Sequence, residues 1–128
     1  MFPESQINSE LMARAVKLSQ IEKELSLVCL TPPKEDCQIQ TGFASDVLSD
    51  VLASASAGSL WVTTQTNLNV IAVASHVKIF TVVFSSGQRP GHEVLLRAVE
   101  EGIGLYSSAA DTFEVVGKLF SIGLRGRF

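Results

Sequence analysis

The stretch Lys78-Ile79-Phe80-Thr81-Val82-Val83-Phe84 decides the fold class of this chain. It is β-branched and aromatic throughout, which is typical of a central parallel strand that is buried on both faces. A polar loop over residues 85–91 follows, and the next pattern predicts a helix over His92–Glu101 that ends at Gly102. A strand that leads through a short loop into a helix is the repeating unit of an α/β domain.

The same unit recurs on both sides of this stretch. Upstream, Leu60–Thr63 is predicted to form a strand, and Asn67 is predicted to cap a helix that runs from Leu68 to about Ser75. Downstream, Ile103–Tyr106 is predicted to be the last strand, and Asp111 with Glu114 has the spacing of a capping box. The residues of the two downstream helices predicted to face inward are Leu95, Leu96, Val99, Val115, Val116, Leu119, Phe120 and Ile122.

The first third of the chain has shorter elements. Ser19 and Glu22 have capping-box spacing and predict a short helix that ends near Leu25, followed by a strand over Leu27–Leu30. Gln38–Gln40 is predicted to be a weak strand that runs into Thr41-Gly42. Ser45-Asp46 is then predicted to cap a helix that Gly58 ends. The predicted buried side of that helix is Val47, Leu48, Val51, Leu52 and Ala55.

These units predict a three-layer α/β fold with a mostly parallel central sheet of about four to five strands and helices on both faces. The predicted organisation is an N-terminal extension over 1–18, one domain over 19–124 and a C-terminal tail over 125–128. Ser9-Glu10 is a candidate helix start within the extension.

Composition excludes several classes of function. The net charge is −3 and no Lys/Arg cluster follows a phosphate backbone, so we expect neither nucleic-acid nor anionic-membrane binding. We also expect no membrane span and no signal peptide. The expected state of the two cysteines indicates a cytoplasmic protein. Cys29 and Cys37 are expected to be reduced, and with His76 and His92 they do not complete a metal set, so we predict no metal and no cofactor.

One long stretch carries a family resemblance. Asp36-Cys37-Gln38-Ile39-Gln40-Thr41-Gly42-Phe43-Ala44-Ser45-Asp46-Val47-Leu48-Ser49-Asp50-Val51-Leu52-Ala53 resembles the signature of the DRTGG domain, and the likeness continues from about Lys17 to Leu124. Aligned on the two Ser-Asp pairs, Cys37 stands at the family's Arg, Gln40 at its Thr and Thr41 at its first Gly. Asp36 and Gly42 are the two residues of the naming motif that this chain keeps.

The resemblance implies a fold and a regulatory habit rather than a reaction. The domain is similar to the non-catalytic N-terminal domain of HPr kinases. Related copies accompany phosphotransacetylase domains and lie inside CBS-containing pyrophosphatases, where the resemblance implies sensing. Free-standing copies are often labelled kinase-like, or are linked to iron hydrogenases, mainly by genomic neighbourhood.

The predicted carboxyl ends of the strands carry small hydroxyl and amide side chains. Ligands of open parallel sheets collect at these ends, where helix N-termini favour anions. The candidate ligand-binding residues are Thr41, Gly42, Ser45, Asp46, Thr64, Gln65, Thr66, Asn67, Ser86, Gly87, Arg89 and Ser108. The alternative is that these residues only cap helices and make turns.

Several single features also have two interpretations. Asp46 and Asp50, at i and i+4, either share a metal or proton or only complement a helix dipole. Trp61 either marks an interface or packs in the core. Arg89 either holds a phosphate or is solvated. Phe128 lies exposed unless the tail docks, and together with the apolar composition this predicts a homodimer.

The sequence therefore supports three hypotheses of different classes. The first is a non-catalytic sensing or adaptor domain that binds a small polar or nucleotide-like ligand or a partner protein. The second is a purely structural or interaction protein, for example an accessory of a redox or hydrogenase system. The third is a small enzyme, against which stands the lack of a Gly-Lys-Ser/Thr phosphate loop and of a nucleophile elbow.

Overall fold

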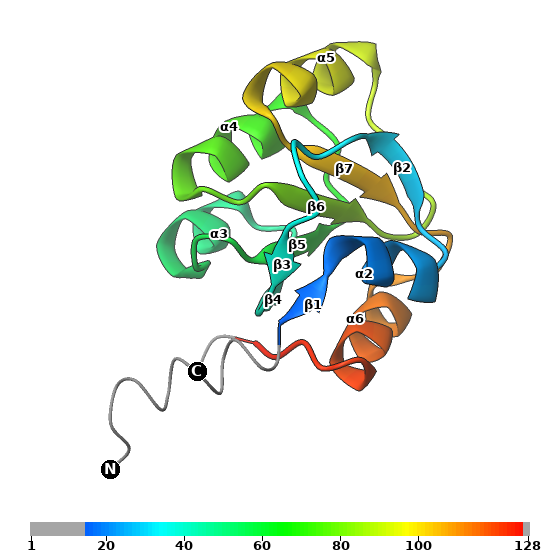
Figure 1. Cartoon of the computed structure of the whole chain (residues 1–128). Coiled ribbons are helices and arrows are strands. Elements are labelled where there is room, and N and C mark those ends of the chain that lie inside the picture. Colours follow the sequence, from blue (N-terminus) through cyan, green and yellow to red (C-terminus); the bar gives the residue numbers. More distant parts are fainter. Residues whose placement is uncertain (1–14, 127–128) are drawn as a thin grey trace.

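The computed structural model of the protein describes residues 15–126, and its elements are built around one five-stranded sheet (Figure 1). The strands are β1 (Val16–Lys17), β2 (Val28–Thr31), β3 (Gln38–Ile39), β4 (Gly42–Ala44), β5 (Leu60–Thr63), β6 (Thr81–Phe84) and β7 (Gly104–Ser107). The helices are α2 (Leu18–Glu24), α3 (Leu48–Ser54), α4 (Leu68–Val77), α5 (His92–Glu101) and α6 (Thr112–Ser121).

The main sheet has the strand order β2-β7-β6-β5-β4. The four strands from β4 to β7 are parallel and lie in chain order, while β2 pairs antiparallel with β7 and carries an irregularity between Cys29 and Thr31. The short strands β1 and β3 form a separate two-stranded antiparallel sheet. The prediction of a mostly parallel sheet of four to five strands is confirmed.

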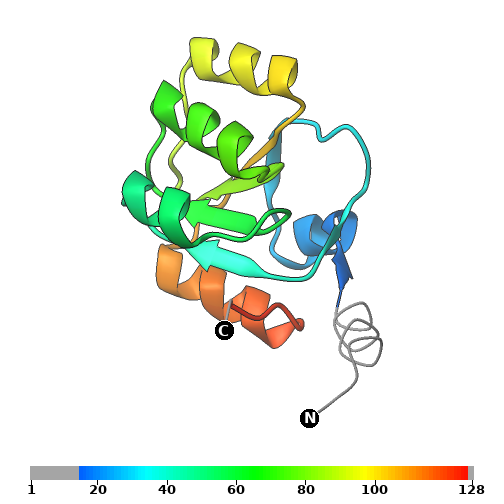
Figure 2. The same ribbon diagram turned by 90° about the vertical axis from the view of Figure 1, so that its left-hand side faces the viewer.

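Two helical layers cover the sheet, as Figures 1 and 2 show. Helices α3, α4 and α5 pack on one face through a core that includes Trp61, Val82 and Phe84. Helices α2 and α6 pack on the other face, against a core that includes Val83 and Tyr106. The three-layer prediction is therefore confirmed, and Trp61, which is fully buried, takes the core role rather than the interface role.

Elements and helix caps that depend on residues close together in the sequence were predicted well. Leu60–Thr63 and His92–Glu101 form the predicted strand and helix, and Gly102 ends that helix with φ +71°. The side chain of Asn67 caps α4 by accepting from the Asn69 amide at 2.9 Å, and the Asp111 carboxylate accepts from the Glu114 amide at 2.9 Å. Cys29 and Cys37 are free thiols in this structure.

Two predicted strands were placed wrongly. The strand expected from Lys78 begins at Thr81, because Lys78 ends α4 in the left-handed region at φ +63° and the chain is still turning there. The strand expected over Gln38–Gln40 splits. Its first part pairs with β1, and the edge strand of the main sheet is Gly42–Ala44.

The inward faces of three helices were also partly wrong. In α5, Val94 and Ala98 are buried, whereas Leu96 and Val99 are 52% and 59% exposed. The apolar residues of α5 form one broad face, and only the side of it that carries Val94 and Ala98 packs on the core. In α3 and α6 the predicted inward residues Val47, Leu52, Val116 and Phe120 are exposed, and the buried anchors are Val51, Val115 and Leu119.

Two predicted caps do not cap. Helix α2 begins after Lys17 and α3 after Val47, and neither helix has a side-chain cap. Ser19 and Asp46 are instead bound to residues about 17 positions away, which a local spacing rule cannot detect. Helix α3 ends at Ser54, before the turn at Gly58. The predictions for Ser9-Glu10 and for Phe128 lie outside the described residues.

Candidate functional site

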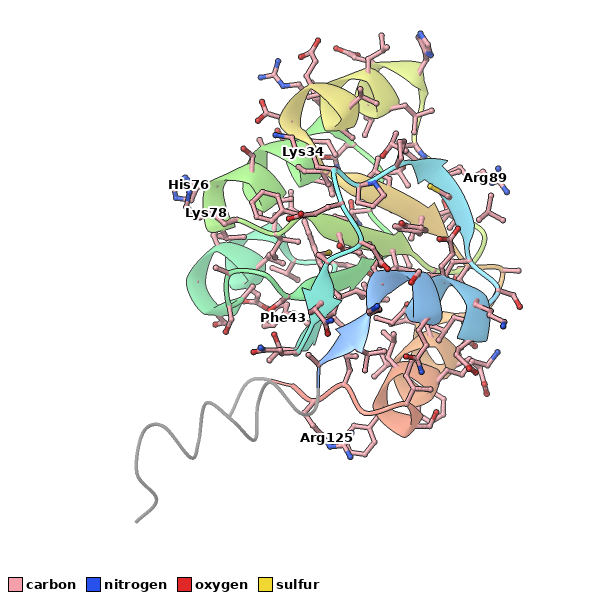
Figure 3. The ribbon with its side chains drawn as sticks, in the orientation of Figure 1. Lys34, Phe43, His76, Lys78, Arg89 and Arg125 are labelled. Carbon is pink, nitrogen blue, oxygen red and sulfur yellow. The ribbon has the colours of Figure 1, made fainter. Side chains whose placement is uncertain are left out.

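The exits of the four parallel strands lie along one edge of the sheet, as the sequence predicted. They are Ser45-Asp46 after β4, Thr64–Asn67 after β5, Ser85–Gly91 after β6 and Ser108–Asp111 after β7. In Figure 3, Arg89 lies at this edge, whereas His76 and Lys78 lie at the opposite edge. We call this line of loops the strand-end rim.

Thr41 and Gly42 do not belong to the strand-end rim. Gly42 is the first residue of β4 and pairs with Leu60, the first residue of β5, so both lie at the amino ends of the strands. The Thr41 hydroxyl is 2.8 Å from the Ser59 hydroxyl at that end. Their predicted position was wrong because the edge strand starts at residue 42 rather than ending there.

The exits of β4 and β5 are joined by Asp46. Its carboxylate accepts from the Thr63 hydroxyl at 2.9 Å, from the Thr64 amide at 2.7 Å and from the Thr64 hydroxyl at 2.8 Å. Desolvation acts to raise the pKa of Asp46, but the three hydrogen bonds outweigh it and the pKa lies below its ordinary value. Asp46 precedes α3, so the predicted i, i+4 pair with Asp50 on one helix does not form.

Ser45 has a supporting role beside Asp46. Its hydroxyl accepts from the Val47 amide at 3.0 Å, and its carbonyl accepts from the indole N–H of Trp61 at 2.9 Å. These bonds of Ser45 and Asp46 therefore hold the loop before α3 against β5.

The exits of β6 and β7 are where the chain diverges, because α5 follows on one face and α6 on the other. Such divergence opens the ligand crevice of many parallel sheets. Here the two loops are hydrogen-bonded to each other. The bonds are Ser86 N–H to Ala110 O at 2.7 Å, Gly87 N–H to Ser108 O at 2.7 Å, Ser107 Oγ to Gln88 O at 3.0 Å, and Ser85 Oγ with Thr112 Oγ1 at 2.6 Å.

The exits of β5 and β6 differ from both neighbours. Within residues 15–126 the side chains of Thr66, Ser86 and Arg89 make no hydrogen bond or ion pair, and the Gln65 amide only accepts a long bond of 3.4 Å from Asn67. Arg89 is exposed, and Ser86 is held with its side chain exposed by a left-handed turn at φ +59°. These loops present donors without partners.

Helix α5 begins beside these loops with an uncapped N-terminus. Its N-cap is Gly91, which has no side chain to accept from the first turn. The free N–H groups of a helix start carry partial positive charge and favour an anion. Together with Arg89, two residues earlier, they make this part of the rim suited to a phosphate or carboxylate group.

One contact that the sequence reasoning missed involves Asp36. Its carboxylate accepts from the Ser19 amide at 2.9 Å and from the Ser19 hydroxyl at 2.7 Å, and these bonds lower the pKa of Asp36. The neighbouring Cys37 is half-buried, with its sulfur 3.9 Å from the Thr81 hydroxyl. The sequence drew attention to Ser19 through its capping-box spacing with Glu22. The hydrogen-bond partner of Ser19 is Asp36, which lies outside that helix.

Two findings bear on other classes of site. Residues 15–126 contain no group of three or more His, Cys, Asp or Glu side chains placed to hold a metal ion. None of the helices in this part of the chain is long and apolar enough to cross a membrane.

Comparisons with solved structures bear on the fold of the chain. No family model and no curated protein matches the chain. A similar solved structure is that of the CBS and DRTGG domains of the regulatory region of Clostridium perfringens pyrophosphatase, complexed with its activator, diadenosine tetraphosphate. The TM-score is 0.75 at 15% identity, and the match covers 90% of this chain and 50% of that one. The predicted DRTGG resemblance is confirmed at the level of the fold, and the chain spans about half the length of that regulatory region.

Proposed function

We propose that the chain is a non-catalytic regulatory or sensing module that binds a small anionic, nucleotide-like ligand at the strand-end rim. The observation that carries this proposal is the group of unpartnered side chains at the exits of β5 and β6, beside the uncapped start of α5. The nucleotide activator in the structure of similar fold supports the same ligand class.

The residues of the rim divide into two roles in this proposal. Arg89 and the first-turn amides of α5 bind the anionic group, because a guanidinium and a helix start are both matched to phosphate oxygens. Gln65, Thr66 and Ser86 supply hydrogen bonds to the polar remainder of the ligand. The residues that hold these loops in place are Ser45, Asp46, Thr64, Asn67, Gly87 and Ser108.

A thermal-shift titration tests the ligand. ATP, diadenosine tetraphosphate and acetyl phosphate are each added to the purified chain, and one of them is expected to raise Tm because it binds the native state alone. Arg89→Gln is expected to remove the shift. Arg97→Gln, an exposed arginine on α5 paired with Glu100 and Glu101, is the matched control and is expected to keep it.

A flat response to all three compounds, or an equal loss of the shift in both arginine variants, contradicts the ligand proposal. We propose no catalytic step for this chain. We propose residues 19–124 as the module, with Val16 and Leu18 packed on its core. The free thiols support a cytoplasmic location.

A protein partner is the second candidate, and the outer surface of α6 favours it. Phe113, Val116 and Phe120 lie at i, i+3 and i+7 and are exposed, Phe113 by 85%. Apolar stripes of this kind are typical of interaction sites, so we propose that the module also forms a homodimer or binds an adaptor partner. Sedimentation as a monomer at tens of micromolar, with no stoichiometric partner in a pull-down, contradicts this second proposal.

A further inference from the structure

The loop between β2 and β3 crosses the sheet at the amino ends of two central strands, β6 and β7 (Figure 1). Pro33 lies against Gly104, the first residue of β7, since a Cβ built at Gly104 would stand 3.2 Å from the Pro33 Cβ. The Cys37 sulfur lies 3.9 Å from the hydroxyl of Thr81, the first residue of β6. The loop therefore lies at the edge of the sheet opposite the strand-end rim.

A pocket opens between this loop and the residue that precedes β6. It has a volume of about 220 Å³ and is lined by Pro33, Lys34, Glu35, Cys37, Phe80 and Gly102. We call it the amino-end pocket. None of its lining residues belongs to the strand-end rim, so a ligand bound here does not compete with a ligand bound there.

Phe80 forms an exposed aromatic wall of the amino-end pocket. Its side chain is 48% exposed, although its neighbours Ile79 and Thr81 are buried. Its carbonyl accepts from the Gly104 amide at 2.8 Å, which holds the backbone at this point. Apolar area that is left in water is unfavourable, so a flat apolar ligand gains free energy when it covers this ring.

Lys34 brings a positive charge to the same pocket, beside the end of α5 (Figure 3). A Cβ built at Gly102 would clash with Lys34 Cε and stand 3.0 Å from its Cδ, so the methylene stem lies directly across this glycine. Within residues 15–126 Lys34 makes no ion pair. Because the stem is already packed on the backbone, little side-chain freedom is lost when the ammonium group binds an anion.

These walls select a ligand by its shape and its charge. The rings of Phe80 and Pro33 match a flat apolar group, and the Lys34 ammonium matches a carboxylate. The Glu35 carboxylate lines the same pocket and disfavours a ligand with several negative charges, such as a polyphosphate. The volume of about 220 Å³ lies below the roughly 300–1,000 Å³ of sites for drug-sized ligands, which limits the ligand to a single ring.

We propose that the amino-end pocket binds a small aromatic monocarboxylate, a compound with one ring and one carboxylate. The ring packs on Phe80 and Pro33, and the carboxylate accepts from the Lys34 ammonium group. This site takes a different class of ligand from the strand-end rim and lies at the opposite edge of the sheet. The inference therefore goes beyond the proposed function and does not rest on it.

An NMR titration of the isotopically labelled full chain with benzoate tests the site. The amides of Lys34, Cys37, Phe80 and Gly102 are expected to shift, because these residues line the pocket. Benzamide has the same ring without the charge, and it is expected to bind roughly fivefold more weakly because one exposed ion pair is lost. Acetate has the carboxylate without the ring and is expected to shift none of these amides.

Variants of the two walls separate the charge from the ring. Lys34→Met keeps an unbranched side chain and removes the charge, so it is expected to weaken benzoate binding roughly fivefold and to leave benzamide binding unchanged. Phe80→Ala is expected to weaken the binding of both compounds. Lys78→Met removes an exposed lysine at the same edge of the sheet that does not line the pocket, and it is expected to bind benzoate as the wild type does.

Three outcomes overturn the inference. The first is a benzoate titration that shifts none of the four pocket amides. The second is a Lys34→Met variant that binds benzoate as tightly as the wild type does. The third is a loss of benzoate binding in Arg89→Gln, which assigns the carboxylate to the strand-end rim. Benzoate binding that Lys34→Met weakens and Arg89→Gln leaves unchanged supports the inference, whether or not a nucleotide raises Tm.

Discussion

The middle pair of exits on the strand-end rim, after β5 and β6, differs from the two outer pairs in one respect. In each outer pair, hydrogen bonds join one exit to the other, as in the Asp46 bonds to Thr63 and Thr64. At the middle pair the side chains of Thr66, Ser86 and Arg89 have none among the described residues. The same residue types therefore hold the fold together in one place and lack partners among the described residues in another. The two groups of residues differ in whether their side chains have hydrogen-bond partners, and not in residue type.

The largest expected effect on stability comes from removing the Asp46 carboxylate. This variant tests whether the partnered side chains of the rim hold the fold together. Asp46→Ala takes the acceptor from two threonine hydroxyls and one amide, and Thr63 is fully buried. We expect the free energy of unfolding to fall by about 2 kcal/mol, measured by urea denaturation. Asp50→Ala, an exposed acid in α3, is the control and is expected to change stability by less than about 0.5 kcal/mol. Equal effects of the two variants would remove the contrast.

The next largest expected effect is the pH dependence of the stability that Asp46 contributes. The folded-state pKa of Asp46 is lowered, so its contribution is fully present above its ordinary value of 3.8 and is lost as pH falls through the folded pKa. The stability difference between the wild type and Asp46→Asn is therefore expected to be constant from pH 7 to pH 5. Below pH 3.8 it is expected to shrink as the carboxylate becomes protonated. A difference that grows on acidification would mean that burial, not the hydrogen bonds, dominates the carboxylate.

Ser86→Gly sharpens the contrast at a residue that belongs to both regions. The Ser86 amide bonds Ala110, while its side chain stands free in a left-handed turn at φ +59°. Glycine adopts this conformation without steric cost, so we expect stability to rise by about 0.5 kcal/mol in thermal denaturation. The ligand-induced shift is expected to weaken in the same variant. A loss of stability would show that the serine hydroxyl has a structural role.

Thr66→Ala is the smallest expected change. Its side chain makes no hydrogen bond within residues 15–126, so the free energy of unfolding is expected to move by less than about 0.5 kcal/mol. Isothermal titration calorimetry with the nucleotide that raises Tm is expected to show weaker binding to Thr66→Ala than to the wild type. If stability falls as far as in Asp46→Ala, Thr66 belongs with the structural residues.

The sequence predicted the parts of the fold that depend on local chemistry. Asn67 and Asp111 cap their helices, and Gly102 ends α5, because each acts on backbone groups within a few residues. The strands rich in β-branched and aromatic residues were predicted because a strand that is buried on both faces consists mainly of apolar residues. The strand-end rim followed from these strands and their direction.

The predictions that were wrong or missing concern residues whose partners lie far away in the sequence. Asp36 binds Ser19, and Asp46 binds Thr63 and Thr64, each across about 17 positions, so neither role is visible in local spacing. The short strand Gly42–Ala44 has no β-branched residue, and pairing with β5 alone makes it a strand. Which rim residues lack partners is likewise a property of the tertiary structure.

The cross-linked exits of β6 and β7 also set how a ligand would be captured. The base of the 85–91 loop is fixed by Ala110 and Ser108 in the free protein. A ligand that meets Arg89 on such a loop does not have to immobilise the backbone, so little configurational freedom is lost on association. Encounter rather than rearrangement then governs the association rate, and differences among ligands appear in their residence times. The module would follow changes in ligand concentration without a lag.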